Sequence, residues 1–514
     1  KPTAPEALLR PYRSLRAFVD KLCAEFGWEL ASMLFSAYFG VKGFLYQLAT
    51  RGMLPYAKEL LGIDGAEYAK MYMVAMTPWG MKAWIGCLSD VVPISGYHKR
   101  YYVVGASVLG AAACLGLATA PASHTLATLL FFATFLQQAT VDLLCEGKYA
   151  EKMAEKPETG PMLVSWVWGT YQSGGLLAAL VMGPLIWAAG PRGIWWVAVP
   201  FAAQVLAPAL KGWLPEERLP PRERRWNTSL VRSQPRILLL ALLMAAAALS
   251  VAGTELLWGS EGASQAAVVM SLSVALIAVG FWALPRPLAM GNAYLFLCEA
   301  TYIQIDGAMD YFYTADEECL PGGPAFSWVY YITYAQVVGC VGGWLGVVCF
   351  QSFMSKWKFR AVFWVSTVVR VAASVFDIII VKRWNTQVGV PDRWAYMLGD
   401  AVVYSVAYML NFMPGVVLTS KLCPSNLEAT VYALLAGFQN FGQTVARSLG
   451  VFLMVSFGIR TTTKDGGGEG CDFSRLPQLL VLCHMLLPMI MVPLSFVMLP
   501  NKRMDEALEL EGAA

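Results

Sequence analysis

The stretch Thr77–Tyr102, TPWGMKAWIGCLSDVVPISGYHKRYY, decides how the rest of the chain is interpreted. An apolar run ends at Asp90, a short loop broken by proline and glycine follows, and Lys99-Arg100 opens the next apolar run. A helix end leaves carbonyl groups unpaired, and the next helix starts with unpaired N–H groups. A carboxylate at this junction can hold the loop, while Lys and Arg fix its side of the membrane. The pattern predicts two membrane-spanning helices joined by a cytoplasmic loop.

The composition places this pattern in an all-α polytopic membrane protein. Of 514 residues, 57% are hydrophobic and 14% are charged, and the mean hydropathy is +0.52. This is too apolar for a soluble protein, and a net charge of +3 argues against nucleic-acid binding. The eleven cysteines lie mostly in apolar runs, and neither a CxxC pair nor an HExxH motif is present. We therefore expect no metal site and no cofactor.

Apolar runs of about 20 residues, the length that crosses a bilayer as a helix, recur along the chain. They form a pattern of six, two and six spans. The expected spans are 26–49, 71–89, 101–120, 125–147, 162–189 and 194–213, then 237–253 and 266–284, then 288–311, 327–351, 360–381, 395–418, 428–457 and 477–499. The expected domains are an arm at 1–25, a six-helix bundle at 26–213, a basic linker with two extra helices at 214–287, a second six-helix bundle at 288–499, and a tail at 500–514.

The loops between these runs differ in charge. Lys and Arg gather in the arm and in the 89–100, 148–160, 214–236 and 356–360 loops, whereas the 253–265 and 312–326 loops contain none. By the positive-inside rule, both termini are expected in the cytosol, although Lys382, Arg383 and Arg393 break the pattern. Cys319 and Cys471 fall in outward-facing loops and form a candidate disulfide. We expect the plasma membrane, with an organellar or plastid membrane as the alternative.

The two sets of six spans look like copies of each other. Gly169-Thr-Tyr-Gln172-Ser-Gly174 in the fifth span is matched by Gly437-Phe-Gln-Asn440-Phe-Gly442 in the eleventh of the twelve. Many transporters are built from two repeats with the substrate bound between them near mid-membrane. Glycine pairs also permit close helix packing without transport, so the repeat alone leaves both interpretations open.

Several motifs carry a family resemblance. The loop at Gly86, Asp90 and Gly96 resembles the loop between the second and third helices of major facilitator transporters, with a longer Asp-to-Gly spacing. Tyr38-Phe-Gly-Val-Lys-Gly43, Pro78-Trp-Gly-Met-Lys82 and Lys421-Leu-Cys-Pro-Ser-Asn-Leu-Glu-Ala-Thr resemble the folate–biopterin transporter family. The resemblance implies a major facilitator fold, two six-helix bundles with two extra helices in the middle, and transport of folates or pterins. Some relatives are associated with S-adenosylmethionine.

The resemblance also suggests roles for charged residues. An ionisable side chain at mid-membrane costs several kcal/mol, so each one is a candidate site. Lys42 and Arg447 lie on helices that line the cavity in major facilitator folds. We expect them to bind the anionic part of the substrate, together with Tyr38, Gln172 and Asn440. Arg370 and Asp377, two turns apart, are interpreted as a structural pair. The gating loop is expected to comprise Gly86, Asp90, Lys99 and Arg100.

Proton coupling needs a carboxylate whose charge can change. Asp142 and Asp310 are the candidates, because each has a second carboxylate, Glu146 or Asp306, one turn away. If Lys42 or Arg447 neutralises these acids instead, no proton is carried. The sequence therefore leaves both alternatives, transport with and without proton coupling.

Three functions compete for this sequence. The first is a secondary active transporter of folate or biopterin-type pterins, working by alternating access. The alternatives are a transporter of another small metabolite such as S-adenosylmethionine, and a non-transporting receptor or structural subunit that kept the fold. An enzyme is not expected, because no nucleophile–base pair, metal cluster or phosphate-binding loop is visible. The expected partners are a small-molecule substrate and the lipid bilayer.

Overall fold

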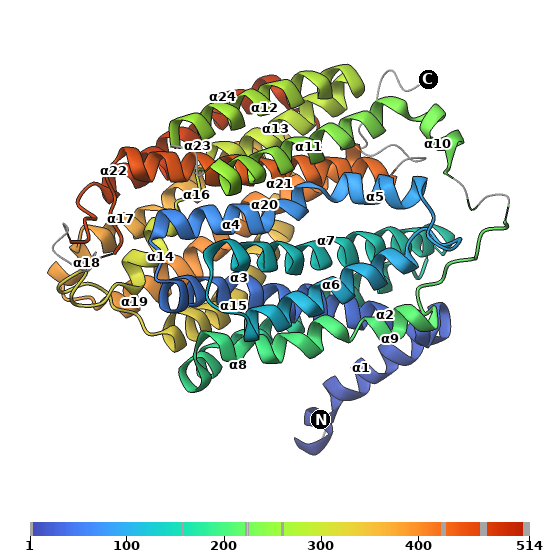
Figure 1. Ribbon diagram of the computed structural model, residues 1–514, viewed down its shortest axis with the longest axis horizontal. Helices are drawn as coiled ribbons and strands as arrows, with labels where there is room; N and C mark the ends of the chain where they lie inside the picture. The colour runs from blue at the N-terminus through green and yellow to red at the C-terminus, as the bar shows by residue number, and fades with distance from the viewer. Residues whose placement is uncertain are drawn as a thin grey trace.

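The computed structural model describes residues 4–156, 158–221, 224, 226–258, 262–422, 428–462 and 470–506. Over these residues the chain consists of helices and loops, with only isolated β-bridges. Most helices lie side by side along the long axis of the molecule (Figure 1). The predicted all-α membrane fold is confirmed. The predicted domain boundaries stay a prediction, and parts of the Leu-Cys-Pro signature, of the basic linker and of the tail lie outside the described residues.

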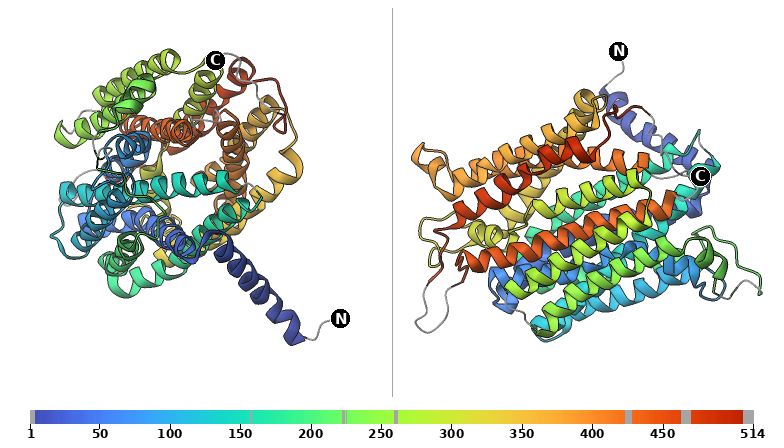
Figure 2. Two further views of the ribbon diagram at one scale, coloured as in Figure 1. Left: turned by 90° about the vertical axis from the view of Figure 1, so that its right-hand side faces the viewer. Right: turned by 90° about the horizontal axis from the view of Figure 1, so that it is seen from above.

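The first membrane helix is longer than predicted. The amphipathic arm helix α1 (Ala4–Phe26) ends at Gly27, whose positive φ of 85° turns the chain, and α1 then projects away from the bundle (Figure 2). The next rod runs without a break until Gly62, with a π-helical middle. It consists of α2 (Trp28–Phe35), η1 (Ser36–Leu45), α3 (Tyr46–Pro55) and η2 (Tyr56–Leu61).

The rest of the N-terminal half follows the predicted order. A kink at Met81 divides the second rod, and Gly190, with a φ of 68°, divides the fifth and sixth spans, which form one element. The elements are α4 (Gly65–Gly80), α5 (Lys82–Val91), α6 (Arg100–Thr119), α7 (His124–Glu155), α8 (Pro161–Ala203) and α9 (Leu206–Lys211).

The middle of the chain adds a short linker helix and two long helices. These are α10 (Thr228–Ser233), α11 (Pro235–Trp258) and α12 (Gly262–Ala283). α11 packs against α4 and α5, while α12 packs against α21 and α13. The two extra helices therefore cover the outside of one seam between the halves.

The C-terminal half contains more interruptions than the first. Its seventh span is broken between α13 (Arg286–Thr301) and α14 (Asp306–Thr314). The remaining elements are η3 (Val329–Tyr334), α15 (Ala335–Cys349), η4 (Phe350–Met354), α16 (Phe359–Ala373), α17 (Val375–Val381), α18 (Trp384–Gln387), α19 (Asp392–Tyr396), η5 (Met397–Tyr404), α20 (Ser405–Leu422), α21 (Glu428–Ser456), α22 (Leu476–Leu480), η6 (Val481–Leu486), α23 (Leu487–Met489) and α24 (Met491–Met498).

Nine helical segments among the described residues are long and apolar enough to cross a membrane. The chain is thus an integral membrane protein. Four predicted spans lie outside that set, namely those at 26–49, 71–89, 288–311 and 428–457. These spans contain Lys42, Lys82, Asp306 with Asp310, and Arg447 in that order. Each of these four rods therefore carries at least one internal charge, although Asp142, Arg370 and Asp377 lie on helices within the set.

Two loops of the C-terminal half are joined covalently. Cys319 and Cys471 form a disulfide, with their Cα atoms 5.2 Å apart. The predicted pairing is confirmed. It connects the loop after α14 to the loop before α22, two segments separated by 152 residues in the chain.

Candidate functional site

A buried ion cluster occupies the centre of the N-terminal half. The ammonium groups of Lys42 on η1 and Lys82 on α5 each lie 2.7 Å from a carboxylate oxygen of Asp142 on α7. Lys82 also lies 3.8 Å from Glu146. The Asp142 side chain is fully buried, so both cations are needed near it. Lys82 was missed by the sequence analysis as a partner, although its position within an apolar run was a sufficient signal.

Aromatic rings surround the Lys42 ammonium. It lies 5.5 Å from the Tyr38 ring centroid, 5.8 Å from Trp168 and 5.9 Å from Tyr171. Tyr38 is only 1% exposed, and its hydroxyl donates to the Asp142 backbone carbonyl at 3.4 Å. In this conformation Tyr38 therefore supports the cluster and does not face an opening. Lys42 itself is 23% exposed, and Gln172 lies half-buried next to Tyr171.

Arg447 on α21 lies beside the break in the seventh span. Its Nε is 3.8 Å from Asp306, the first residue of α14, and its guanidinium lies 4.7 Å from the Tyr72 ring centroid. The Arg447 side chain is 12% exposed and that of Asp306 is 40% exposed. The ion pair is therefore long, and its carboxylate partner Asp306 is exposed. Arg447 is not locked against Asp310.

Asn440 on the same helix connects the two halves. Its side-chain amide donates to the backbone carbonyl of Trp79 at 3.1 Å. Trp79 lies next to the kink at Met81, where the regular helical pattern ends. The predicted binding residue Asn440 therefore satisfies a carbonyl group of the opposite half in this conformation.

The break itself, at residues 302–305, replaces the continuous helix that was predicted at 288–311. His484 Nε2 lies 3.1 Å from the Ile303 carbonyl oxygen, and the Gln304 N–H donates to Ala446 at 3.3 Å. A Cβ on Gly450 would lie 1.9 Å from the Gln304 carbonyl oxygen, so only glycine leaves room for this backbone. Broken helices near mid-membrane commonly form the binding sites of transporters.

Carboxylates in the C-terminal half are held by phenols. Asp310 accepts hydrogen bonds from Tyr331 at 2.6 Å and from Tyr68 at 3.2 Å. Asp377 accepts one from Tyr313 at 2.7 Å. Within the described part of the chain, neither carboxylate forms an ion pair with a lysine or arginine. Neutral donors therefore replace the cations that hold Asp142.

The interpretation of Arg370 and Asp377 as a pair is wrong. Arg370 lies over the Tyr302 ring, 3.5 Å from its centroid, and its Nη1 donates to Asn411 at 3.3 Å. α16 ends at Ala373, and two residues seven apart in a helix are separated by about 10 Å along its axis. Arg370 and Asp377 consequently contact different sets of residues.

Arg51 on α3 is a charged residue that the sequence analysis missed. The first span was predicted to end at residue 49, which placed this arginine in a loop. The helix instead continues, and Arg51 is an exposed residue within it. Its signal was an arginine in the otherwise weakly polar run Gln47-Leu-Ala-Thr-Arg-Gly-Met-Leu54.

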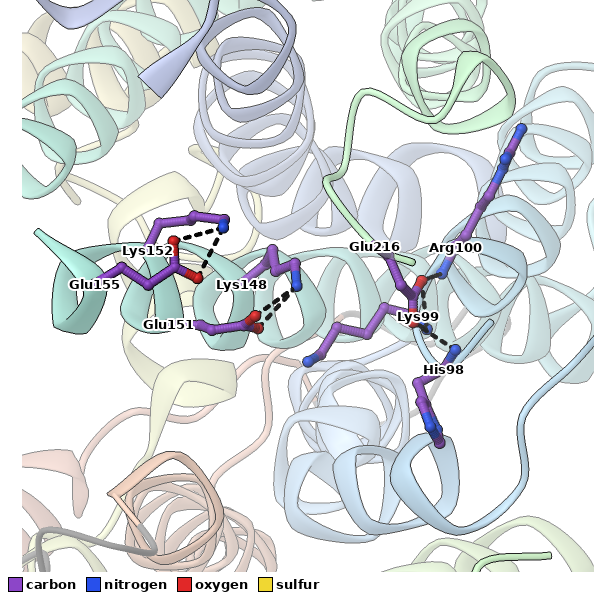
Figure 3. Close-up of polar contacts among 8 residues, drawn as sticks. All are labelled: His98, Lys99, Arg100, Lys148, Glu151, Lys152, Glu155 and Glu216. Atoms are coloured by element: carbon purple, nitrogen blue, oxygen red, sulfur yellow. Dashed lines mark hydrogen bonds and ion pairs between the residues drawn. The ribbon is translucent and has the colours of Figure 1, made fainter. Parts of the chain in front are cut away.

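At the end of the bundle that carries α5 and the linker, Glu216 binds the start of α6. Its carboxylate accepts hydrogen bonds from the backbone N–H groups of His98, Lys99 and Arg100 at 2.5, 3.0 and 3.1 Å (Figure 3). A carboxylate at a helix N-terminus satisfies unpaired donors and complements the helix dipole. The sequence analysis assigned this loop to Asp90 and missed Glu216, which lies more than 100 residues away.

The four predicted gating residues lie together in and beside this loop. The Lys99 side chain runs toward α7, where its Cε lies within 3.7 Å of the position that a Gly147 Cβ would take (Figure 3). The Arg100 guanidinium donates to the Leu210 carbonyl. Burial raises the pKa of the Asp90 carboxyl, and the positive charges of Lys99 and His98 oppose that rise. The loop is held mainly through backbone contacts.

Comparison with known proteins identifies the family and the fold. A family model described as the BT1 family matches residues 42–514. The folate-biopterin transporter of Synechocystis sp. is 27% identical over 442 residues, covering 85% of this chain and 77% of the relative. Probable folate-biopterin transporter 6 of Arabidopsis thaliana is 23% identical over 507 residues, covering 97% and 88%. A POT family transporter solved with 5-aminolevulinic acid is 13% identical with a TM-score of 0.65, covering 91% and 94%. The fold is that of the major facilitator transporters.

Proposed function

Since the chain belongs to the BT1 family, we propose that it is a secondary active transporter of folates or biopterin-type pterins that works by alternating access. The observation that carries the proposal is the pair of charged clusters, around Lys42 in one half and Arg447 in the other. A scaffold or receptor has no need to keep partly exposed cations inside both halves, since each is costly in a membrane.

Arg447 and Lys42 are proposed to bind the anionic part of the substrate. Arginine can bind a carboxylate through two parallel hydrogen bonds, and the loose contact with Asp306 leaves these donors accessible. Lys42 keeps an exposed portion beside Trp168 and Tyr171, whose rings can cover a flat pterin. Gln172 would add a polar contact. Tyr38 and Asn440 would act by positioning Lys42 and α4.

Coupling to protons is proposed to use Asp310. Its carboxylate is bound by phenols, so it can take up a proton without leaving a cation unpaired. Asp142 is a weaker candidate, because Lys42 and Lys82 both neutralise it. A carboxylate that lysine neutralises carries no proton, so these contacts argue against proton transfer at Asp142.

The proposed orientation places both termini in the cytosol, with the plasma membrane as the site of action. The end of the bundle with α5 and α10 (Figure 1) also carries Lys- and Arg-rich loops, which supports a cytoplasmic assignment. In this orientation the loop with Gly86, Asp90, Lys99 and Arg100 is the inner gate. The disulfide then lies on the outer side, where the environment permits it.

Uptake by cells that express the chain tests the proposal. Labelled folate, biopterin and S-adenosylmethionine are offered separately, and folate or biopterin uptake above that of empty cells is expected. Arg447→Ala should abolish folate uptake while the protein stays in the membrane, and Arg447→Lys should restore it only in part. Uptake of S-adenosylmethionine alone would support the alternative substrate. Binding of a pterin without any uptake would support a receptor.

A further inference from the structure

Arg51 occupies an unusual position for an arginine within a membrane rod. It lies on α3, nine residues beyond Lys42, and residues on both sides of it are buried in the core. Gly52, Met53 and Leu54 are all buried, whereas Arg51 is exposed. The side chain therefore projects from a packed helix into solvent-accessible space.

The neighbours of Arg51 show where that space lies. Lys58, seven residues further along the same rod, donates to the Thr314 carbonyl on α14, so this face of the rod meets the C-terminal half. Tyr331 on η3, Tyr396 on α19 and Asp310 on α14 interact electrostatically with the Arg51 guanidinium, as does Tyr72 on α4. The first three belong to the C-terminal half, and the fourth belongs to the N-terminal half. Arg51 thus projects between the halves and not toward lipid.

Other internal cations are already bound by protein groups. Lys42 and Lys82 contact Asp142, Arg447 contacts Asp306, Arg370 contacts Asn411, and Lys58 donates to the Thr314 carbonyl at 2.5 Å. Arg51, by contrast, makes no hydrogen bond or ion pair with the residues that the structure describes. A guanidinium with free donors between two halves is suited to an external anion.

We propose that Arg51 and the surrounding phenols form a carboxylate-binding subsite for the anionic tail of the substrate. This inference rests on the proposed transport of folates and pterins, and it separates the two substrates. Folates carry a glutamate tail with carboxylates at the end opposite the pterin ring, and biopterin has no carboxylate. Arg51 and Lys42 are separated by roughly 13 Å along the helix axis, so they can bind opposite ends of one extended ligand.

The chemistry explains why an arginine with aromatic neighbours fits this role. Two parallel N–H···O bonds fix the plane of a carboxylate, which an ammonium group cannot do. The Tyr331 hydroxyl donates to Asp310, so the phenols act on the ligand carboxylate through their rings, which limit access of water. Asp310 lies beside this subsite, so its negative charge would oppose an anion unless the carboxyl is protonated. Binding of an anionic tail would then favour protonation of Asp310.

Three variants test the subsite: Arg51→Met, Arg51→Lys, and Arg475→Met, which changes an exposed outer arginine and serves as the control. Arg51→Met should raise the KM for folate by about tenfold or more, because charge-assisted hydrogen bonds contribute this much. Biopterin uptake should stay within about twofold of the unchanged chain. Arg51→Lys should fall between these results, and the control should transport both substrates normally.

Binding of p-aminobenzoylglutamate to the purified full chain provides a test that is independent of transport. This probe has the carboxylates of folate but lacks the pterin ring. Weaker binding by Arg51→Met supports the subsite even if the native chain transports no pterin, in which case the proposed function alone fails. Unchanged probe binding, or an equal loss of folate and biopterin uptake in a folded variant, would overturn the subsite and leave the proposed function standing.

Discussion

The two halves of the molecule hold the internal carboxylates Asp142 and Asp310 in opposite ways. In the N-terminal half, Asp142 lies between the ammonium groups of Lys42 and Lys82, each at 2.7 Å. In the C-terminal half, Asp310 accepts hydrogen bonds from Tyr331 and Tyr68. Ammonium groups favour a permanent negative charge, whereas phenols can bind either form of a carboxyl group. The first half is thus suited to hold a fixed charge and the second to change one.

The first and seventh spans, which are equivalent in the two halves, also differ in the continuity of their backbones. The first span passes the centre as an unbroken rod, although its middle is π-helical, and it packs on α8 where Gly43 and Gly174 leave no room for a side chain. The seventh span is broken at 302–305 and packs on α21 at Gly450. π-helical turns and breaks both concentrate at functional sites. The comparison indicates that the C-terminal half contains the more adaptable backbone.

Asp142→Asn should have the largest effect on stability. The substitution leaves the buried Lys82 ammonium and the partly exposed Lys42 ammonium without a full counter-charge. Losing one partner of a buried pair costs about 3–5 kcal/mol. Thermal unfolding of the purified chain in detergent measures the change.

The double variant Asp142→Asn/Lys82→Met provides the matched control. It removes the charge that was left unpaired, so part of the lost stability should return. An Asp142→Asn chain as stable as the unchanged one would show that the N-terminal cluster is not held by its charges.

Gly174→Ala and Gly450→Ala should have the next largest effects, and Gly450 is the position at the broken helix. Its Cβ would lie 1.9 Å from the Gln304 carbonyl oxygen, so the break must shift, at a cost of about 1–3 kcal/mol. Gly174→Ala is the equivalent change in the first half, where the Cβ would lie 2.1 Å from the Phe39 carbonyl.

Gly169→Ala serves as the control for both, because nothing lies within 4 Å of its Cβ position. If the broken helix is the more adaptable one, Gly450→Ala should be less destabilising than Gly174→Ala. Equal unfolding temperatures for those two variants would contradict the difference in backbone adaptability.

Hydropathy predicted most of the spans but not the interruptions within them. Apolar runs locate helices because a bilayer favours about 20 such residues in a row. The break at 302–305 has no such signal, since Tyr302 and Ile303 are apolar and the break depends on His484 and Gly450 in distant helices. The predicted first span ended too early, at residue 49, because polar residues follow Leu48. Packing against the rest of the N-terminal half keeps the residues after Leu48 helical.

Charged residues were located more reliably than their partners. Lys42, Asp142, Asp310 and Arg447 stood out, because any charge in an apolar run is noticeable. Their contacts join residues from different helices, as in the 60-residue separation of Lys82 and Asp142. Spacing along one helix suggested a pair between Arg370 and Asp377 that does not form. One sequence contains no information on which helix faces which, so such pairs require the structure.

Glu216→Gln should have a smaller effect, at the loop before α6 that is proposed to act as a gate. The neutral amide keeps one acceptor but loses the charge that complements the α6 dipole, which is worth about 0.3–1 kcal/mol. Glu217→Gln changes the exposed neighbour and is the control.

Because the Glu216 contacts join the linker to the gating loop, Glu216→Gln should also change the maximal transport rate more than the KM. If Glu217→Gln gave the same change, the effect would come from linker charge in general and not from the bonds to residues 98–100.

Asp310→Asn should have the smallest effect on stability and a selective effect on coupling. Asparagine can still accept from the phenols of Tyr331 and Tyr68, so the free energy of unfolding should change by less than about 1 kcal/mol. The amide side chain of asparagine does not gain or lose a proton near neutral pH. Uptake driven by an inward proton gradient should therefore lose its dependence on the gradient, while exchange of labelled for unlabelled substrate continues. Asp316→Asn, in an exposed loop position, is the control. Gradient-driven uptake that persists in Asp310→Asn would show that another residue carries the coupling proton. The functional contrast between the two halves would then not hold.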